Sequence, residues 1–181
     1  MVLGSDVAHV EALARAIELA GRRYGMSLHW GKTQALPIRS GQRVRNPDGT
    51  LAASKGSMVY LGGIISRHGG AHGELSRRIG LATAAFKALK QVWSHANFKS
   101  RDKVSYFNLF VVSKLLYSLN TCCLTKAQRR RLDGFQARCL RRMFKVAPSY
   151  ISRVSNDSVL GMAGAKPLSK HVQVRQLALL S

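Results

Sequence analysis

The chain has 181 residues, enough for one well-packed domain or two small ones, and its hydrophobic content of 46% excludes a largely disordered polypeptide. Its 29 lysines and arginines outnumber 8 acidic residues and give a net charge of +21, which favours a polyanionic partner such as nucleic acid. A ribosome-like basic protein or a protein of the membrane surface is the alternative.

The first 70 residues are predicted to combine one helix with short strands. Met1–Leu3 resembles the end of a strand whose partner would lie upstream. Asp6 can cap a helix that ends near Tyr24, where Gly25 suits a left-handed cap. Further along, the pattern predicts strands at 26–30, 34–38 and 59–65, and a polar excursion at 39–57 with a turn at 46–49.

Helical periodicity begins after a glycine-rich loop. From residue 74 the apolar residues recur every three or four positions, at Leu75, Ile79, Ala82, Phe86, Leu89 and Trp93. The next helix, 100–119, is apolar over most of its circumference, and we expect it to be the central core helix.

Three further helices are predicted toward the end of the chain. Thr125 and Gln128 form a capping box that opens a helix. Its inward residues are Leu132, Phe135, Cys139, Leu140 and Met143. Shorter helices follow at 156–163 and from 169 onward. The expected fold class is therefore α+β and helix-dominated, with a partial antiparallel sheet followed by an all-α bundle.

Cations gather behind the apolar stripes of two predicted helices. The helix predicted from residue 74 carries Arg77, Arg78, Lys87 and Lys90. The outer face of the capped helix and its end carries Arg129, Arg130, Arg131, Arg138, Arg141, Arg142 and Lys145, with Asp133 as the one acid. Cations this close together repel each other unless phosphates lie near them. We therefore predict contact with nucleic acid, and a solvent-exposed helix face without a partner is the alternative.

Residues that could support metal chemistry are scattered. No two of the eight acids are adjacent or one residue apart, which argues against a complete two-metal centre. His68 and His72 lie in a glycine-rich loop, and we interpret them as solvated residues. Cys122, Cys123 and Cys139 form no Cys-x-x-Cys pair and are expected to be reduced thiols. No metal site is predicted.

Several short motifs together resemble one protein family. They are Gly25-Met26-Ser27-Leu28, Gly31-Lys32-Thr33, Tyr60-Leu61-Gly62-Gly63-Ile64-Ile65, Arg77-Arg78-Ile79, Lys114-Leu115-Leu116-Tyr117, Leu132-Asp133-Gly134-Phe135-Gln136, Arg138-Cys139-Leu140-Arg141 and Val159-Leu160. In this order they resemble the segment that follows the catalytic Tyr-Ala-Asp-Asp motif in reverse transcriptases of non-LTR (LINE-type) retrotransposons. The resemblance covers essentially the whole chain.

The resemblance implies a function for each region. Residues 1–70 would be the end of the palm, 71–147 a helical thumb-like domain, and 148–181 the start of a further helical connection. Lys32 would be a possible general acid for the leaving pyrophosphate, and Tyr60, Leu61 and Gly62 would form the primer-grip strand and its turn. His29 and Trp30 depart from the family pattern, in which asparagine and another polar residue are more frequent.

The resemblance also implies what the isolated chain can do. The aspartates that bind magnesium are expected before Met1, so this chain would carry no cofactor and would not polymerise alone. Its partners would be RNA and DNA as a template-primer duplex. A standalone basic helical nucleic-acid-binding or scaffold module, or a non-functional remnant, is the alternative.

Neither a membrane span nor a signal peptide is predicted, because no apolar run reaches about 18 residues and acids punctuate the amino terminus. We therefore expect an intracellular protein, in a nuclear or cytoplasmic ribonucleoprotein.

Overall fold

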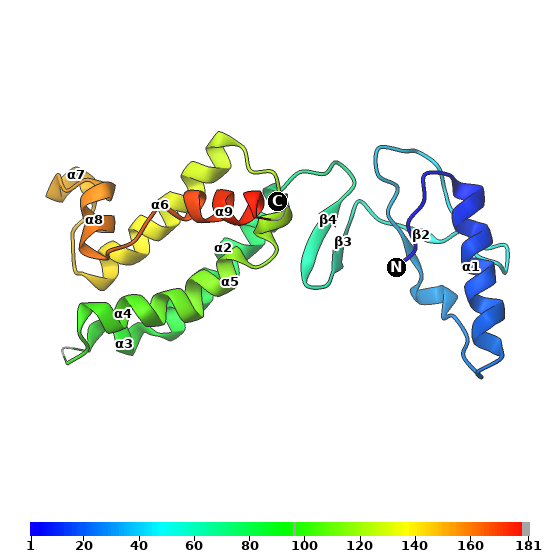
Figure 1. Cartoon of the computed structure of the whole chain (residues 1–181), viewed down its shortest axis with the longest axis horizontal. Helices are drawn as coiled ribbons and strands as arrows, with labels where there is room; N and C mark the ends of the chain where they lie inside the picture. The colour runs from blue at the N-terminus through cyan, green and yellow to red at the C-terminus, as the bar shows by residue number, and fades with distance from the viewer. Residues whose placement is uncertain (96, 179–181) are drawn as a thin grey trace. The chain divides into compact units, whose positions relative to one another are not determined.

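The computed structural model describes residues 1–95 and 97–178. The chain folds into two compact units, the N-terminal unit (Met1–Gly69) and the helical unit (Gly70–Ser181). Their elements are labelled in Figure 1, and the fold is α+β and dominated by helices, as predicted. Within the helical unit, Val159, Leu160, Leu168 and Val172 belong to the same hydrophobic core as the helices before residue 148.

The N-terminal unit begins with helix α1 (Val7–Arg22), which confirms the prediction for this segment. The Asp6 side chain accepts a hydrogen bond from the backbone N–H of Ala8 at 3.4 Å. At the other end Gly25 has a φ of 71°, and the Met26 N–H bonds to the carbonyl of Gly21 at 3.0 Å. Local capping therefore defines both ends of α1, although none of its residues is buried.

The loop region after α1 contains less strand than predicted. Segment 26–30 is not a strand, since Met26 and Leu28 remain exposed and no sheet covers their side; it leads into the 3-10 turn η1 (Trp30–Lys32). Strand β1 (Gln34–Ala35) is short and pairs with β2 (Ala53–Ser54) in parallel, so the expected antiparallel pairing does not extend to these two strands. The predicted turn at 46–49 is confirmed by a bond from the Gly49 N–H to the Asn46 carbonyl at 2.9 Å.

The apolar segment 59–65 is a hairpin and not the single strand that was predicted. Strand β3 (Ser57–Tyr60) pairs antiparallel with β4 (Gly63–Ser66), and the chain reverses through Leu61 and Gly62. Both loop residues have positive φ, 46° and 76°, as a two-residue type I′ turn requires. The apolar pattern alone did not indicate this turn, because leucine rarely occupies its first position, whereas the family resemblance implies a turn at Tyr60-Leu61-Gly62.

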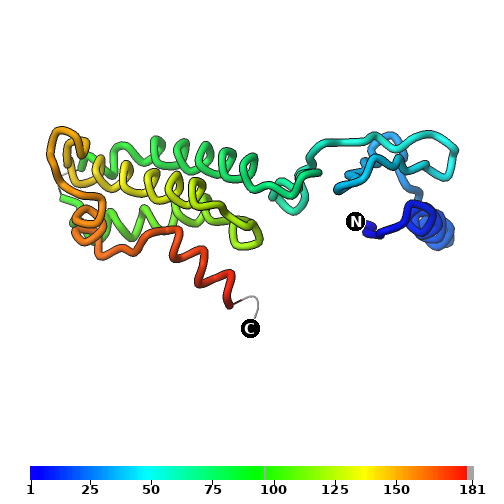
Figure 2. The backbone as a smooth tube through the Cα atoms, turned by 90° about the horizontal axis from the view of Figure 1, so that it is seen from above, coloured from blue at the N-terminus to red at the C-terminus, as the bar shows by residue number. Residues whose placement is uncertain are grey.

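The helical unit is built from consecutive helices whose path is followed in Figure 2. They are α2 (His72–Ala88), α3 (Lys90–Ser94), α4 (Ser100–Tyr106), the π-helical segment η2 (Phe107–Val112), α5 (Ser113–Leu116), the 3-10 turn η3 (Leu119–Thr121), α6 (Lys126–Met143), α7 (Ser149–Ser152), α8 (Asn156–Met162) and α9 (Leu168–Leu177). Within the described residues, none of these helices is both long and apolar enough to cross a membrane.

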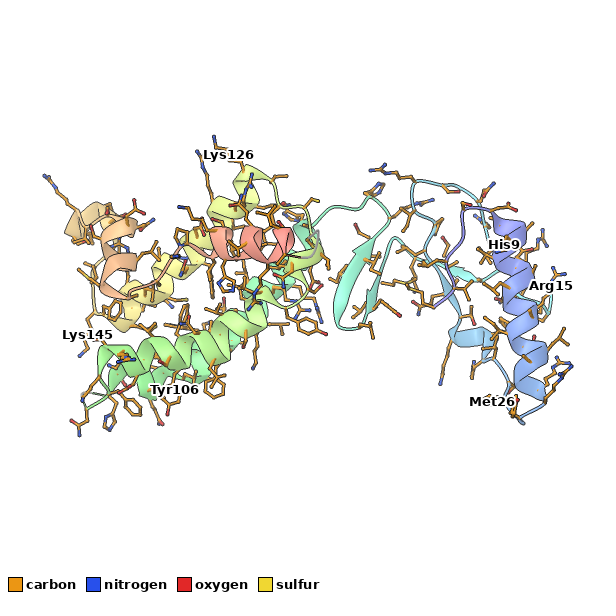
Figure 3. All side chains as sticks on the ribbon, in the orientation of Figure 1. His9, Arg15, Met26, Tyr106, Lys126 and Lys145 are labelled. Atoms are coloured by element: carbon orange, nitrogen blue, oxygen red, sulfur yellow. The ribbon has the colours of Figure 1, made fainter. Side chains whose placement is uncertain are left out.

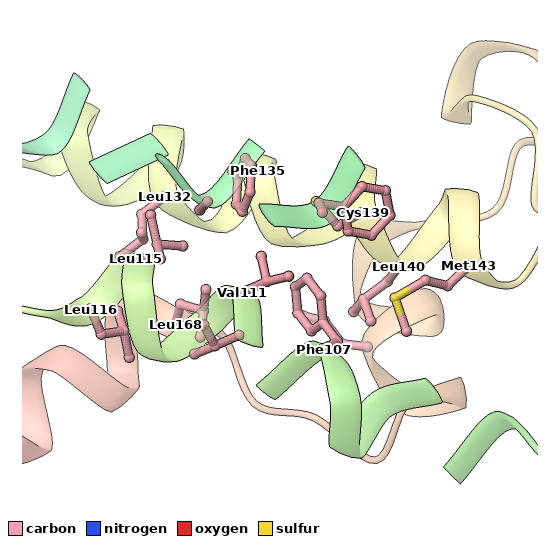
Figure 4. Packing of buried hydrophobic residues seen from close by; sticks show 14 of the residues in the cluster. Phe107, Val111, Leu115, Leu116, Leu132, Phe135, Cys139, Leu140, Met143 and Leu168 are labelled. Atoms are coloured by element: carbon pink, nitrogen blue, oxygen red, sulfur yellow. The ribbon is translucent and has the colours of Figure 1, made fainter. Parts of the chain in front are cut away.

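One core joins these helices. The stripe of α2 is buried at Leu75, Ala82 and Phe86, and the side chains of α6 meet those of η2 and α5 as Figure 4 shows. Trp93 of α3 stacks on Phe86 with ring centroids 5.1 Å apart. Residues of α8 and α9 close the cluster, at Val159, Leu160, Leu168 and Val172. The apolar stripes predicted for α2 and α6 are confirmed.

The helix from α4 to α5 is only half buried. Phe107, Val111 and Leu115 lie in the core, whereas Leu109 and Phe110 are 63% and 41% exposed. This segment therefore contributes to the core, as predicted, but only part of its apolar circumference is buried, because α2, α6 and their neighbours cover one side of it. The helix also ends at Leu116, earlier than predicted.

Helix α6 holds the end of the chain in place. Its predicted capping box is present, with the Gln128 N–H bonded to Thr125 Oγ1 at 3.3 Å and the Thr125 N–H to Gln128 Oε1 at 2.8 Å. The Asp133 carboxylate accepts the backbone N–H and the hydroxyl of Ser169 at 2.9 and 2.7 Å. Gln136 accepts from the Leu168 N–H at 3.0 Å, so the first turn of α9 is fixed to α6.

Candidate nucleic-acid interface

The positive charge is concentrated in the helical unit. From residue 70 to 181 there are 20 lysines and arginines and 4 acids, a net charge of 20 − 4 = +16. Residues 1–69 hold 9 lysines and arginines and 4 acids, a net charge of 9 − 4 = +5. The electrostatic attraction for an anion would therefore be stronger at the helical unit.

Two of the four acids of the helical unit are used inside the fold. Glu74 is 1% exposed and accepts from Arg78 Nε at 2.5 Å, with Arg77 Nη1 at 3.5 Å. Asp133 is occupied by Ser169. Asp102 and Asp157 are the two exposed acids, so nearly all charged side chains on the surface of this unit are cations.

Three exposed arginines follow one side of α6, and we call them the arginine row: Arg131, Arg138 and Arg142. Their spacings of seven and four residues place them within about 40° of each other around the helix and spread them over about 16 Å along it. Arg131 Nη1 donates to Ser76 Oγ of α2 at 3.0 Å, so the first arginine of the row reaches the side of α2 that carries Ser76.

A glycine keeps this side of α6 open. Gly134 lies between Arg131 and Arg138 on the same side, and a Cβ atom there would meet Arg138 Nη1 at 3.6 Å. A longer side chain would therefore compete with the guanidinium for space. The row presents planar, fork-shaped donors that suit phosphate oxygens.

Two cations predicted to contact nucleic acid are buried. Arg78 is 6% exposed; besides its bond to Glu74, its guanidinium lies 4.6 Å from the centre of the Tyr117 ring. Arg141 is 7% exposed and donates to the carbonyls of Ala147 and Val154, at 3.0 and 2.6 Å. Both stabilise the fold, because a buried guanidinium needs partners of this kind, and neither reaches the surface in this structure.

The other predicted cations lie outside the arginine row. Lys87 and Lys90 are exposed on α2 and α3, and Arg77 is paired with Glu74. Arg129 is half-buried, while Arg130 is exposed but turned about 100° from Arg131 around the helix. Lys145 follows the end of α6 and is exposed. The structure therefore brings only some of the cations predicted to contact nucleic acid together in the arginine row.

The candidate residues of the N-terminal unit lie on two separate elements. Lys32 is exposed at the end of η1, where its N–H bonds to the carbonyl of His29 at 2.9 Å. Tyr60, Leu61 and Gly62 lie at the tip of the β3–β4 hairpin, where Leu61 is 75% exposed.

The three cysteines are free thiols in the structure. Burial raises the pKa of Cys139 to about 12, although Arg138 and Arg142 oppose this shift. Burial also raises the pKa of Cys122. A raised pKa lowers the thiolate fraction, so neither group is suited to nucleophilic or metal chemistry near neutral pH. Among residues 1–95 and 97–178, no three His, Cys, Asp or Glu side chains gather at one point where a metal ion could bind.

One buried cation, Lys103, was not predicted from the sequence. Lys103 is 9% exposed, and its Nζ donates to the carbonyl of Trp93 at 2.9 Å. A signal was available, because Lys103 precedes Phe107, Val111 and Leu115 at intervals of four and so shares their buried side.

Comparison of the chain with known protein families, with curated proteins and with solved structures gives no match.

Proposed function

We propose that this chain is a portion of an RNA-directed DNA polymerase of the non-LTR retrotransposon type and that its helical unit binds the template-primer duplex along α6. The ordered motifs that resemble this family support the first part. The net charge of +16 in the helical unit supports the second part, the binding of the duplex.

The arginine row is the observation that carries the binding proposal. Its length of about 16 Å matches about five phosphates of one strand, which follow each other every 3.4 Å along the duplex axis. Each guanidinium can bind a phosphate through two parallel N–H groups. Contacts of this type do not depend on base sequence, as a polymerase that moves along its template requires.

In the proposed polymerase the N-terminal unit would contribute to the primer end. At the hairpin tip Leu61 is exposed and Gly62 is half-buried, and a glycine lets another backbone approach closely. Lys32 is accessible at the end of η1 and would protonate the leaving pyrophosphate in the complete enzyme. Magnesium would be held there by aspartates that this chain does not contain.

The binding proposal is tested with a labelled RNA–DNA duplex of about two helical turns. Fluorescence anisotropy measures the affinity of the chain for this duplex at increasing salt concentration. The double variant Arg138→Gln/Arg142→Gln should weaken binding about 10- to 100-fold and reduce the log-log salt slope by about 2. The matched control is Lys170→Gln/Arg175→Gln, which removes two exposed charges from α9 and should change affinity by less than about threefold.

Equal losses in the two double variants would show that net charge alone drives binding and would refute an interface on α6. For the polymerase assignment, primer extension with magnesium should give no templated product from this chain alone. Templated synthesis would contradict the proposed division of labour.

A further inference from the structure

A pocket with a volume of about 560 Å³ opens in the helical unit, and its lining includes none of the three arginines of the row. It lies where the α3–α4 corner meets the end of α6 and helix α8. Its polar lining consists of Lys103, Lys145, His95, Ser94 and Ser100, and two phenylalanines and two methionines form the rest. We call it the lysine pocket. The volume lies within the range of about 300–1,000 Å³ that is usual for small-molecule sites.

The inner cation of this pocket is held in a fixed position. Lys103 is more than nine-tenths buried, and Trp93, whose carbonyl receives its ammonium, is itself anchored by a bond from Nε1 to the Phe86 carbonyl at 2.7 Å. An ammonium group has three N–H donors, and the Trp93 carbonyl takes one of them. The other two are available to a ligand that enters the pocket.

The outer cation is placed by the end of α6. Lys145 has a φ of 56°, and the Val146 N–H bonds to the Arg141 carbonyl at 2.9 Å, as in a helix end with a left-handed residue. This conformation turns the chain away from the helix axis and leaves Lys145 at the pocket, close to the beginning of α4 (Figure 3). None of the lining residues is acidic, so no negatively charged side chain of the lining would repel an anion there.

We propose that the lysine pocket binds a nucleoside phosphomonoester, either free or as the terminal unit of a strand. Two ammonium groups match the nearly double negative charge of a phosphomonoester at neutral pH. The two serine hydroxyls add donors for its oxygens. Phe98 and Phe144 provide the apolar wall against which a planar base can stack. The proposal is independent of duplex binding, because the pocket shares no residue with the arginine row.

The test uses isothermal titration calorimetry of the full chain with adenosine 5′-monophosphate at about 0.15 M salt. A single saturable site is expected, with adenosine and inorganic phosphate each binding at least about tenfold more weakly. Lys145→Gly should weaken nucleotide binding about tenfold, the effect of losing one charged contact. Glycine adopts a φ of 56° without strain, so this variant should remain folded, which circular dichroism can verify.

Arg153→Gly is the matched control. Arg153 is also an exposed cation with positive φ, at 54°, but it does not line the pocket. Its replacement should change nucleotide affinity by less than about twofold. Equal losses in the Lys145→Gly and Arg153→Gly variants, or the absence of saturable binding, would overturn the proposal.

A second variant separates the contributions of phosphate and base. Lys103→Met keeps the apolar stem of the side chain and removes the ammonium, so the preference for the nucleotide over adenosine should disappear. If that preference persisted, the inner lysine would not hold the phosphate and the proposal would be wrong.

A 5′-phosphorylated trinucleotide and its 5′-hydroxyl counterpart then distinguish the two sources of the ligand. Tighter binding of the phosphorylated strand supports a strand end. Binding of the mononucleotide alone supports a free nucleotide.

Discussion

The two units of this chain differ in whether the apolar faces of their helices are buried. In the N-terminal unit, the apolar face of α1 remains accessible, with Leu13 and Ile17 at 39% and 42% exposure. In the helical unit, stripes of the same kind on α2 and α6 meet each other and are almost completely buried. Capping and turn formation are therefore enough to define elements in this fold, but a core forms only where several stripes converge.

The largest difference between the units should appear in core truncation. Phe107 is 1% exposed and contacts Phe86 edge to face, so Phe107→Ala should lower the free energy of unfolding of the helical unit by about 3–5 kcal/mol. Leu13→Ala in α1 should change stability by no more than about 0.5 kcal/mol. Urea unfolding followed by circular dichroism measures both. A loss of about 2 kcal/mol for Leu13→Ala would show that α1 belongs to a core after all.

A smaller difference separates two neighbouring cations of α6. Arg141→Ala should cost about 2–3 kcal/mol, because the carbonyls of Ala147 and Val154 lose a charged donor. Arg142→Ala should change the unfolding free energy by less than about 0.5 kcal/mol while weakening duplex binding. Urea unfolding and anisotropy on the same two proteins give the comparison. Similar stability losses would mean that burial does not separate the functions of the two residues.

The smallest effect concerns the hairpin of the N-terminal unit. Leu61→Asn places a residue favoured at this position before Gly62 and should stabilise the hairpin by about 0.5–1 kcal/mol. Amide hydrogen exchange in β3 and β4 should slow accordingly. Leu61→Val should have the opposite effect, since a β-branched side chain resists a positive φ. If neither variant altered exchange, the turn would not limit the stability of this hairpin.

Elements with local signals were predicted well. Asp6 and Gly25 mark the ends of α1, and Thr125 with Gln128 marks the start of α6; each of these interactions spans only a few residues. The apolar pattern at 59–65 predicted one strand and not the hairpin at 57–66, because Leu61 takes a conformation that its residue type disfavours; only the family resemblance implied a turn there. The short strand at 26–30 was predicted from alternation alone, and no neighbouring strand covers it.

The candidate site was only partly predictable, because charge patterns do not reveal burial. Glu74 lies four residues before Arg78, a spacing that could have signalled their ion pair. The acceptors of Arg141 are carbonyls after the end of its helix, and nothing in the local sequence indicates them. The lysine pocket depends on residues from α3, α4, α6 and α8, which only the tertiary fold brings together.

Because Glu74 and Asp133 are engaged within the helical unit, the surface cations have few acidic neighbours to offset their mutual repulsion. Such repulsion opposes compaction, and dissolved salt reduces it only over distances beyond about 8 Å at physiological ionic strength. A polyanion bound to the folded form would relieve the repulsion at closer range and would shift the folding equilibrium toward the native state. Occupancy of the surface and folding of the helical unit are thereby thermodynamically linked, so each should strengthen the other.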